Sequence, residues 1–191
     1  MLTKQARILT KDQAELLLIY AGSTRHPLRD RLIVLLSVKA GLRAGEIAGL
    51  TWDMVLGGDG DLAACIALRD RVAKKRSGRR IPLHPELRDA LVAWRAMTVP
   101  AGHIITSERG GPMRAGSIVL WFARAFRAIG LDGCSSHSGR RTFITRAARL
   151  VHKAGGSLRD VQLLAGHASI TTTQRYIEGD TDAQRKLVSL I

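Results

Sequence analysis

Apolar positions along the chain recur mainly at the three- and four-residue spacing of amphipathic helices. Thr10 followed three residues later by Gln13 is typical of a capping box and predicts a helix start. Pro27 predicts the start of a second helix and Gly41 its end. Further apolar stripes predict helices over residues 85–97, 116–129, 138–153, 157–164 and 171–177, and from residue 181 onward. The pattern therefore predicts a mainly helical domain.

The segment over residues 51–83 has a different pattern. Short apolar runs at residues 51–55, 62–68 and 79–83 predict three strands, since turn-forming glycines and a basic stretch separate them. The basic stretch, residues 74–78, predicts the tip of a hairpin. We therefore expect an α+β fold that is mainly helical and carries a small three-stranded antiparallel sheet.

The composition indicates what kind of partner the chain binds. The chain has 191 residues, enough for one well-buried domain, and a formal net charge of +14. Such a surplus of positive charge favours binding to a polyanion, with nucleic acid as the first candidate. Aromatic residues make up 4% of the chain against 46% for all hydrophobic residues, which favours an aliphatic helical core.

Several other partners are not expected. Cys65 and Cys134 lie far apart and suggest thiols in a reducing cytosol. Cys134 and His137 could form half of a zinc site, but the sequence offers no second half, so no metal is expected. No apolar run approaches the roughly 20 residues that span a bilayer, so no membrane partner is expected. We expect no cofactor and no small-molecule substrate.

Four residues in the C-terminal part are of types that can act on a phosphodiester, namely His137, Arg140, His167 and Tyr176. His137 and Arg140 are three residues apart, so they share one face of a helix start. A tyrosine hydroxyl has a reference pKa of about 10, so it would attack phosphorus only with cations that stabilise the phenolate. The alternative for Tyr176 is a half-buried packing residue.

Two further positions carry candidate chemistry. Arg43 lies just after a predicted helix end, and Glu46, one turn later, could orient it by a charge-assisted hydrogen bond. The alternative is an ordinary surface ion pair, which contributes little. A flexible lysine in the predicted hairpin tip could donate a proton to a leaving oxygen, and the alternative there is a solvated charge run that only contacts backbone phosphates.

Taken together, these motifs resemble the tyrosine recombinase (phage integrase) family, specifically its C-terminal catalytic domain. The resemblance rests on Gly-Leu-Arg43-Ala-Gly-Glu46-Ile, on a lysine ahead of Arg-Ile-Pro-Leu, on His137-x-x-Arg140, and on Leu-x-Gly-His167 followed nine residues later by Tyr176. Each motif alone is weak, but their order and spacing are specific. The match covers nearly the whole chain, so residues 1–191 are expected to form one catalytic domain without the N-terminal core-binding domain of relatives.

The resemblance implies a role for each residue that matches a motif. Tyr176 is implied to attack the scissile phosphate and form a 3′-phosphotyrosyl link, while Arg43 and Arg140 hold the non-bridging oxygens. Lys74 is implied to protonate the leaving 5′-oxygen. Lys75 is the alternative, and Lys74 is preferred because of its spacing to the Arg-Ile-Pro-Leu motif.

The remaining matches imply supporting roles. His137 looks like the general acid and base for the tyrosine hydroxyl, His167 like a hydrogen-bond donor to the phosphate, and Glu46 like a support for the arginines. The residues expected to contact DNA without taking part in the chemistry are Lys75, Arg76, Arg79 and Arg141.

The chain departs from relatives at Gly139, where many have a larger apolar residue, and we expect this glycine to loosen the local helix start. The apolar segment after Glu178 resembles the segment that docks on a neighbouring protomer in recombinase assemblies. The alternative is a helix that folds back on its own domain.

The function that the resemblance implies is site-specific cleavage and rejoining of DNA strands, as in integration or excision of a mobile element, without metal or ATP. The resemblance implies double-stranded DNA as the partner. It also implies that copies of the chain assemble on DNA as a tetramer and act in the cytoplasm, at the nucleoid. The alternatives are a catalytically silent DNA-binding protein of the same fold, a type IB topoisomerase-like enzyme and a helix-turn-helix regulator.

Overall fold

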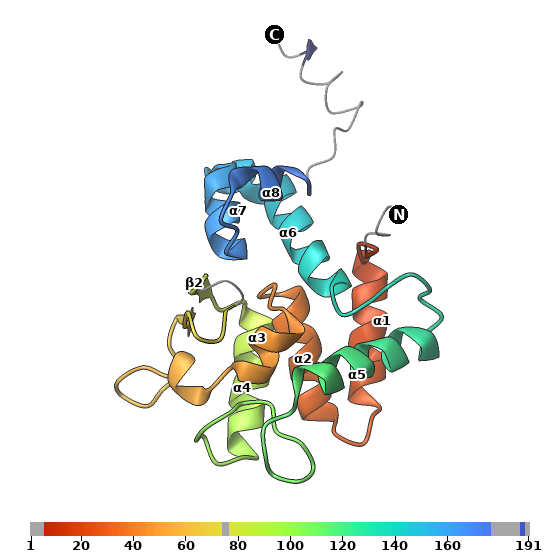
Figure 1. Cartoon of the computed structure of the whole chain (residues 1–191), viewed down its shortest axis with the longest axis vertical. Coiled ribbons are helices and arrows are strands. Elements are labelled where there is room, and N and C mark those ends of the chain that lie inside the picture. Colours follow the sequence, from red (N-terminus) through yellow and green to blue (C-terminus); the bar gives the residue numbers. More distant parts are fainter. Residues whose placement is uncertain (1–5, 74–76, 177–187, 190–191) are drawn as a thin grey trace. The chain divides into compact units, whose positions relative to one another are not determined.

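The computed structural model describes residues 6–73, 77–176 and 188–189 (Figure 1). The chain divides into two compact units, Met1–Phe143 and Ile144–Ile191, and each is described by itself. The described residues confirm a mainly helical α+β fold.

The first unit contains most of the helices. They are α1 (Lys11–Gly22), α2 (Pro27–Val38), α3 (Ala44–Gly49), the 3-10 helix η1 (Trp52–Met54), α4 (Pro85–Ala96) and α5 (Ala115–Ala128). The predicted capping box at the start of α1 is confirmed, because the Gln13 amide donates to Thr10 Oγ1 at 3.1 Å and the Thr10 amide donates to Gln13 Oε1 at 3.0 Å. Pro27 opens α2, as predicted.

The sheet of the first unit has two strands in the part of the chain that the structure describes. They are β1 (Cys65–Leu68) and β2 (Arg79–Pro82), which pair antiparallel with Ile66 opposite Ile81. The strand predicted at residues 51–55 is wrong: η1 occupies this segment, and only Thr51 forms a bridge, to His103. Trp52 and Met54 are both buried in this 3-10 turn, and the Trp52 amide donates to the Gly102 carbonyl at 2.9 Å.

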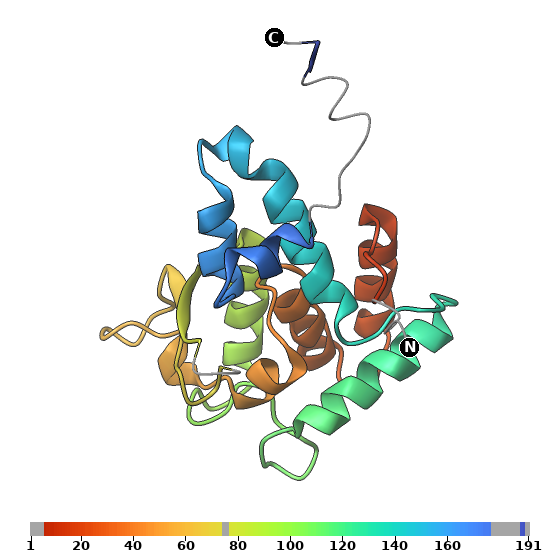
Figure 2. The ribbon, with the colours of Figure 1, turned by 45° about the horizontal axis from the view of Figure 1, so that its top comes forward.

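The core of the first unit is aliphatic and centres on α2. Residues Leu32–Leu36 are buried all round the helix, each 2% exposed or less. Helix α2 packs against α1 on one side and α4 on the other, and α3 packs against α5 (Figures 1 and 2). Since both the end of α2 and the start of α3 are anchored in this core, the short connection between them, at Gly41–Arg43, is held in place.

Helix α6 (Ser138–Leu150) begins in the first unit at an unusually close approach to α2. A Cβ added to Gly139 would lie 2.2 Å from Ser37 Oγ, 3.0 Å from its Cβ and 3.1 Å from Val38 Cγ1. The expectation that Gly139 loosens the helix start is therefore wrong. The absence of a side chain lets the first turn of α6 lie directly against α2, which fixes where the next residue, Arg140, begins.

The second unit contains the rest of α6, the 3-10 helix η3 (Val151–Ala154), α7 (Leu158–Ala165) and α8 (Ile170–Gln174). Ser157 and Asp160 form a capping box at the start of α7, where the Ser157 amide donates to Asp160 Oδ2 at 2.8 Å. Helices α7 and α8 pack against each other. The helix predicted from residue 181 and the tail after Glu178 lie outside the described residues, except for residues 188–189.

In the residues that the structure describes, no helix combines the length and the apolar character needed to cross a membrane.

Replacing Gly139 with alanine should destabilise the first unit. The added methyl would overlap Ser37, so we expect the free energy of unfolding to fall by about 1–3 kcal/mol, as for other overpacked sites. Urea unfolding followed by tryptophan fluorescence measures this change. The matched control is Gly116→Ala on α5, where an added Cβ meets no atom within 4 Å. That variant should be unchanged or slightly more stable, and equal losses in both variants would contradict the close approach.

Candidate active site

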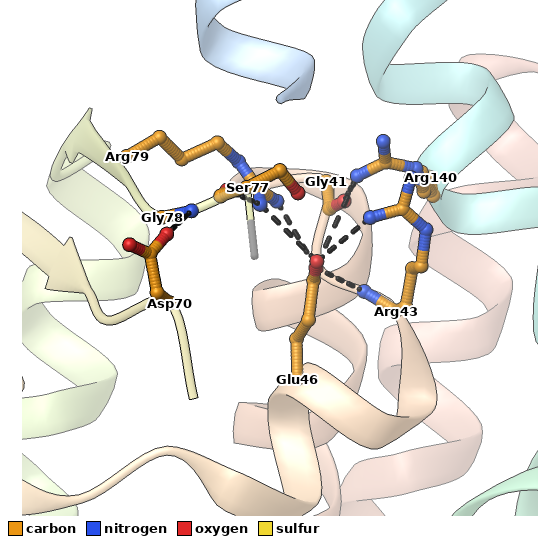
Figure 3. Close-up of polar contacts among 8 residues, drawn as sticks. All are labelled: Gly41, Arg43, Glu46, Asp70, Ser77, Gly78, Arg79 and Arg140. Atoms are coloured by element: carbon orange, nitrogen blue, oxygen red, sulfur yellow. Dashed lines mark hydrogen bonds and ion pairs between the residues drawn. The ribbon is translucent and has the colours of Figure 1, made fainter. Parts of the chain in front are cut away.

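A buried carboxylate organises the candidate site of the first unit (Figure 3). Glu46 on α3 is 1% exposed. Its Oε2 accepts the Arg43 amide at 2.9 Å, and its Oε1 accepts Arg43 Nη1 at 2.7 Å. The expected hydrogen bond between Arg43 and Glu46 is thus present, and it belongs to a buried cluster rather than to a surface ion pair.

Arg79 on β2 binds the same carboxylate through both prongs of its guanidinium. Its Nη1 donates to Glu46 Oε1 at 3.1 Å and its Nη2 to Oε2 at 3.0 Å. Side chains alternate along a strand, so Arg79 shares the inward face with Ile81 while Arg80 is exposed. The prediction that Arg79 contacts DNA stays untested; in the structure both terminal nitrogens of its guanidinium donate to Glu46.

Arg140 reaches the cluster from the first turn of α6. Its Nη1 donates to the Gly41 carbonyl at 2.6 Å and lies 4.0 Å from Glu46 Oε2. Gly41 adopts a φ of 64°, and a Cβ there would lie 2.4 Å from the Phe143 ring. Only glycine therefore suits this turn, and the turn places the carbonyl that Arg140 binds.

These contacts form what we call the arginine cluster: Glu46 with Arg43, Arg79 and Arg140. Burial acts to raise the pKa of Glu46, but the hydrogen bond and charge of Arg79, and then those of Arg43, outweigh it and hold the pKa below its ordinary value. The carboxylate is therefore ionised at neutral pH. Within these four side chains, three guanidinium groups face one carboxylate, so the cluster carries surplus positive charge suited to an anion with several oxygens. The Arg43 side chain is 23% exposed, and those of Arg79 and Arg140 are 4–5% exposed.

His137 lies immediately before α6, one turn ahead of Arg140, and is exposed. Its amide donates to Ser135 Oγ at 3.3 Å, and its carbonyl accepts the amide of Arg141, which is half-buried. The ring is thus at a surface, at the helix start that the sequence predicts for it.

The predicted hairpin is confirmed at its two strands, β1 and β2. The Gly78 amide donates to Asp70 Oδ1 at 2.8 Å, which joins the two sides of the hairpin below its tip (Figure 3). The three tip residues predicted to act there, Lys74, Lys75 and Arg76, lie outside the described residues.

The second unit brings two other predicted residues together. His167 follows the end of α7, and Tyr176 follows α8. Their rings stack with centroids 5.5 Å apart and planes 24° apart. His167 is 9% exposed, and Tyr176 is half-buried. The nine-residue spacing between them holds two residues before α8, the five residues of α8 and one residue after it.

Thr173, which was not identified from the sequence, lies between His167 and Tyr176 along the chain. Thr173 is fully buried, and its Oγ1 lies 3.0 Å from His167 Nδ1. Its carbonyl accepts the Tyr176 amide at 3.0 Å. The run of three threonines gave no sign of which one faces inward. The pairing of Arg79 with Glu46 was also not identified from the sequence, although the alternation with Ile81 was a usable signal for it.

Among the described residues, no group of three or more His, Cys, Asp or Glu side chains is placed to hold a metal ion. The candidate site residues of the first unit form a cationic cluster around Glu46. In the second unit, the imidazole of His167 stacks on the phenol ring of Tyr176.

The fold is similar to that of solved recombinase and integrase structures. It superposes on a crystal structure of XerA recombinase with a TM-score of 0.75 at 22% identity, covering 100% of this chain and 65% of that one. It superposes on a lambda integrase dimer bound to a COC′ core site with a TM-score of 0.72 at 23% identity, covering 93% of this chain and 49% of that one. Because the sequence identities are 22% and 23%, these two superpositions establish the fold alone.

The sequence decides the family. Residues 7–182 match the Phage integrase family. The chain is also 34% identical over 171 residues to tyrosine recombinase XerC of Nitrobacter winogradskyi, covering 85% of this chain and 50% of that protein. The chain therefore belongs to the phage integrase family, and it spans about half the length of this XerC relative.

Replacing Arg79 with methionine should destabilise the first unit strongly. It removes two hydrogen bonds from a buried carboxylate, which we expect to lower the free energy of unfolding by about 3 kcal/mol. This is the lower end of the cost of breaking a buried ion pair, because Arg43 still holds Glu46. Urea unfolding measures the loss.

The matched control for this variant is Arg80→Met on the same strand. Arg80 is exposed and its Nη2 lies 3.2 Å from Cys65 Sγ, so its loss should change the free energy of unfolding by less than about 0.5 kcal/mol. Similar losses for the two variants would contradict the buried pairing of Arg79.

The lowered pKa of Glu46 predicts a pH dependence of stability. A carboxyl group whose pKa is lower in the folded than in the unfolded state stabilises the fold fully above its unfolded pKa, here about 4.5. That contribution is lost as the pH falls through the folded-state pKa. The wild type should therefore exceed Glu46→Gln in free energy of unfolding at pH 7, and the difference should shrink below about pH 4.5.

Urea titrations from about pH 7 to about pH 3 test this, with Glu15→Gln as the control. Glu15 is exposed and its Oε1 lies 3.8 Å from Lys11 Nζ, so its variant should follow the wild type at each pH. A difference between wild type and Glu46→Gln that stays constant over the whole range would rule out the ionised, buried carboxylate.

Proposed function

We propose that the chain, residues 1–191, is the catalytic domain of a site-specific DNA recombinase or integrase. It cleaves and rejoins DNA strands through a 3′-phosphotyrosyl intermediate. The observation that carries the proposal is the arginine cluster, in which a buried Glu46 orients Arg43 and lies beside Arg140. Membership of the phage integrase family supports the same activity.

The first step is capture of the scissile phosphate. Arg43 and Arg140 bind its non-bridging oxygens, because guanidinium groups match phosphate oxygens in charge and geometry. Glu46 fixes the Arg43 guanidinium before the phosphate arrives, so little reorganisation remains in the transition state. Loss of one such preorganised donor costs about a hundredfold or more in rate.

The second step is nucleophilic attack. The Tyr176 hydroxyl oxygen forms a bond to phosphorus, and the bond from phosphorus to the 5′-oxygen breaks. His137 takes the phenol proton, Lys74 gives a proton to the leaving 5′-oxygen, and His167 donates a hydrogen bond to the phosphate. Lys75 is the alternative donor to the leaving group. In the reverse direction, a 5′-hydroxyl attacks the phosphotyrosine and the strand is rejoined.

The proposed reaction requires neither a metal ion nor ATP. The guanidinium groups supply the positive charge that the pentacoordinate phosphorus requires. The phosphotyrosyl link replaces one phosphodiester by another, so it retains the bond energy for rejoining. We therefore propose a reaction that is independent of both.

The proposed partner is double-stranded DNA. A net charge of +14 favours a polyanion, and the lambda integrase of similar fold was solved as a dimer bound to a core site. We propose that Lys75, Arg76 and Arg141 bind backbone phosphates and that copies of the chain assemble on DNA as a tetramer. The chain would act in the cytoplasm, at the nucleoid, because its substrate lies there.

The test is formation of a covalent protein–DNA adduct. Duplexes that bind the chain are first enriched from a randomised pool and sequenced. Nicked suicide versions of the enriched duplex are then incubated with the protein, and adducts are resolved on a denaturing gel. We expect the wild type to form an adduct and Tyr176→Phe to form none, because phenylalanine lacks the attacking oxygen.

The chain provides a matched control, since it contains two tyrosines. Tyr20 lies half-buried on α1, and Tyr20→Phe should form the adduct at the wild-type rate. An adduct with Tyr176→Phe would show that another residue is the nucleophile. Binding without any adduct in the wild type would favour a DNA-binding protein without strand-cleavage activity.

A further inference from the structure

Three consecutive threonines, Thr171, Thr172 and Thr173, lie in α8 between the two rings of the second unit. Thr171 and Thr172 are exposed, whereas Thr173 has no exposed surface. The large majority of buried side-chain polar atoms have a hydrogen-bond partner. The partner of Thr173 is the imidazole of His167, at 3.0 Å from Nδ1.

Thr173 contacts both candidate functional residues of this unit. Its side chain holds His167, and its carbonyl accepts the Tyr176 amide at 3.0 Å, in the turn that ends α8. The Tyr176 ring stacks on the same imidazole. From the other side, Gln162 Nε2 donates to the His167 carbonyl at 2.9 Å, so the backbone of His167 is fixed independently of its ring.

The geometry points to Thr173 as a positioning residue that sets the tautomer and orientation of His167 and anchors the turn that carries Tyr176. Its hydroxyl donates to Nδ1, so the single proton of the neutral imidazole lies on Nε2. This inference rests on the function proposed above, in which His167 donates a hydrogen bond to the scissile phosphate.

The direction of the hydrogen bond follows from what the phosphate requires. Phosphate oxygens only accept hydrogen bonds, so the nitrogen that faces them must carry a proton. With a proton on Nδ1, neutral His167 would present a lone pair at Nε2 and would repel the phosphate. A hydroxyl can act toward Nδ1 as donor or acceptor, and as the donor, the role that the phosphate requires, it pairs with the Nε2–H tautomer; a methyl group of the same size can do neither.

The test compares Thr173→Val, Thr173→Ser and Thr172→Val in the full chain. Valine keeps the volume of threonine but lacks the hydroxyl, and serine keeps the hydroxyl. Thr172→Val makes the same chemical change one residue away, on the exposed side. Circular dichroism and thermal unfolding establish that each variant is folded.

The first measurement is the rate of adduct formation with the enriched nicked duplex. We expect Thr173→Val to be slower than the wild type by about ten- to hundredfold, the scale of a misplaced catalytic group. Thr173→Ser and Thr172→Val should stay within about threefold of the wild type. A wild-type rate for Thr173→Val, or an equal loss for Thr172→Val, would overturn the inference.

The second measurement does not depend on activity. Two-bond proton–nitrogen NMR spectra, recorded at a pH where the imidazole is neutral, report the tautomer of His167, which is assigned by comparison with His167→Asn. We expect the Nε2–H form in the wild type and in Thr173→Ser, and a mixture in Thr173→Val. A protonated Nδ1 in the neutral wild type would overturn the inference. A wild type with the Nε2–H form but no adduct would instead count against the proposed function.

Discussion

The carboxylate of Glu46 is the constraint on which the described structure depends most. An ionised carboxylate removed from water is stable only when cations and hydrogen-bond donors surround it. Arg43, Arg79 and Arg140 meet this need from three distant segments, namely the start of α3, β2 and the start of α6. One side chain therefore ties the sheet, the helical core and the first turn of α6 together. Because three positive groups surround one negative group, the contacts that stabilise the fold also create the surplus charge that an anion would bind.

Features determined within one turn of the chain were predicted correctly from the sequence. The capping box of α1 is an example, since both of its partners lie within four residues. The strand predicted at residues 51–55 failed because its pattern is ambiguous. The alternation of Trp52 and Met54 is typical of a half-buried strand, but both residues are buried in a single 3-10 turn. The amide of Trp52 bonds to the Gly102 carbonyl, and no local pattern reveals a partner so far along the chain.

In the candidate site, too, the residue types could be recognised in the sequence, whereas their packing partners could not. Arginines, histidines and a tyrosine stand out by their chemistry, and the motifs located them. A basic residue can lie equally at a surface or in a buried pair, so the residue type alone did not reveal that Arg79 pairs with Glu46. Gly139 looked like a weak point and is a close packing contact with α2. Thr173 cannot be told from two neighbouring threonines without knowing which face of α8 is buried.

The two groups of candidate residues are built in physically different ways. The arginine cluster joins segments up to about 100 residues apart, such as Gly41 and Arg140, so its geometry depends on the whole core of the first unit. The His167–Tyr176 pair is set within ten residues by the end of α7, by α8 and by the hydroxyl of Thr173. A long-range cluster is rigid because many elements fix it. A local pair keeps its own internal geometry even if neighbouring segments shift. The proposed attack of a phenol on phosphorus would use both properties, because it requires a fixed cationic partner for the phosphate and a well-oriented nucleophile.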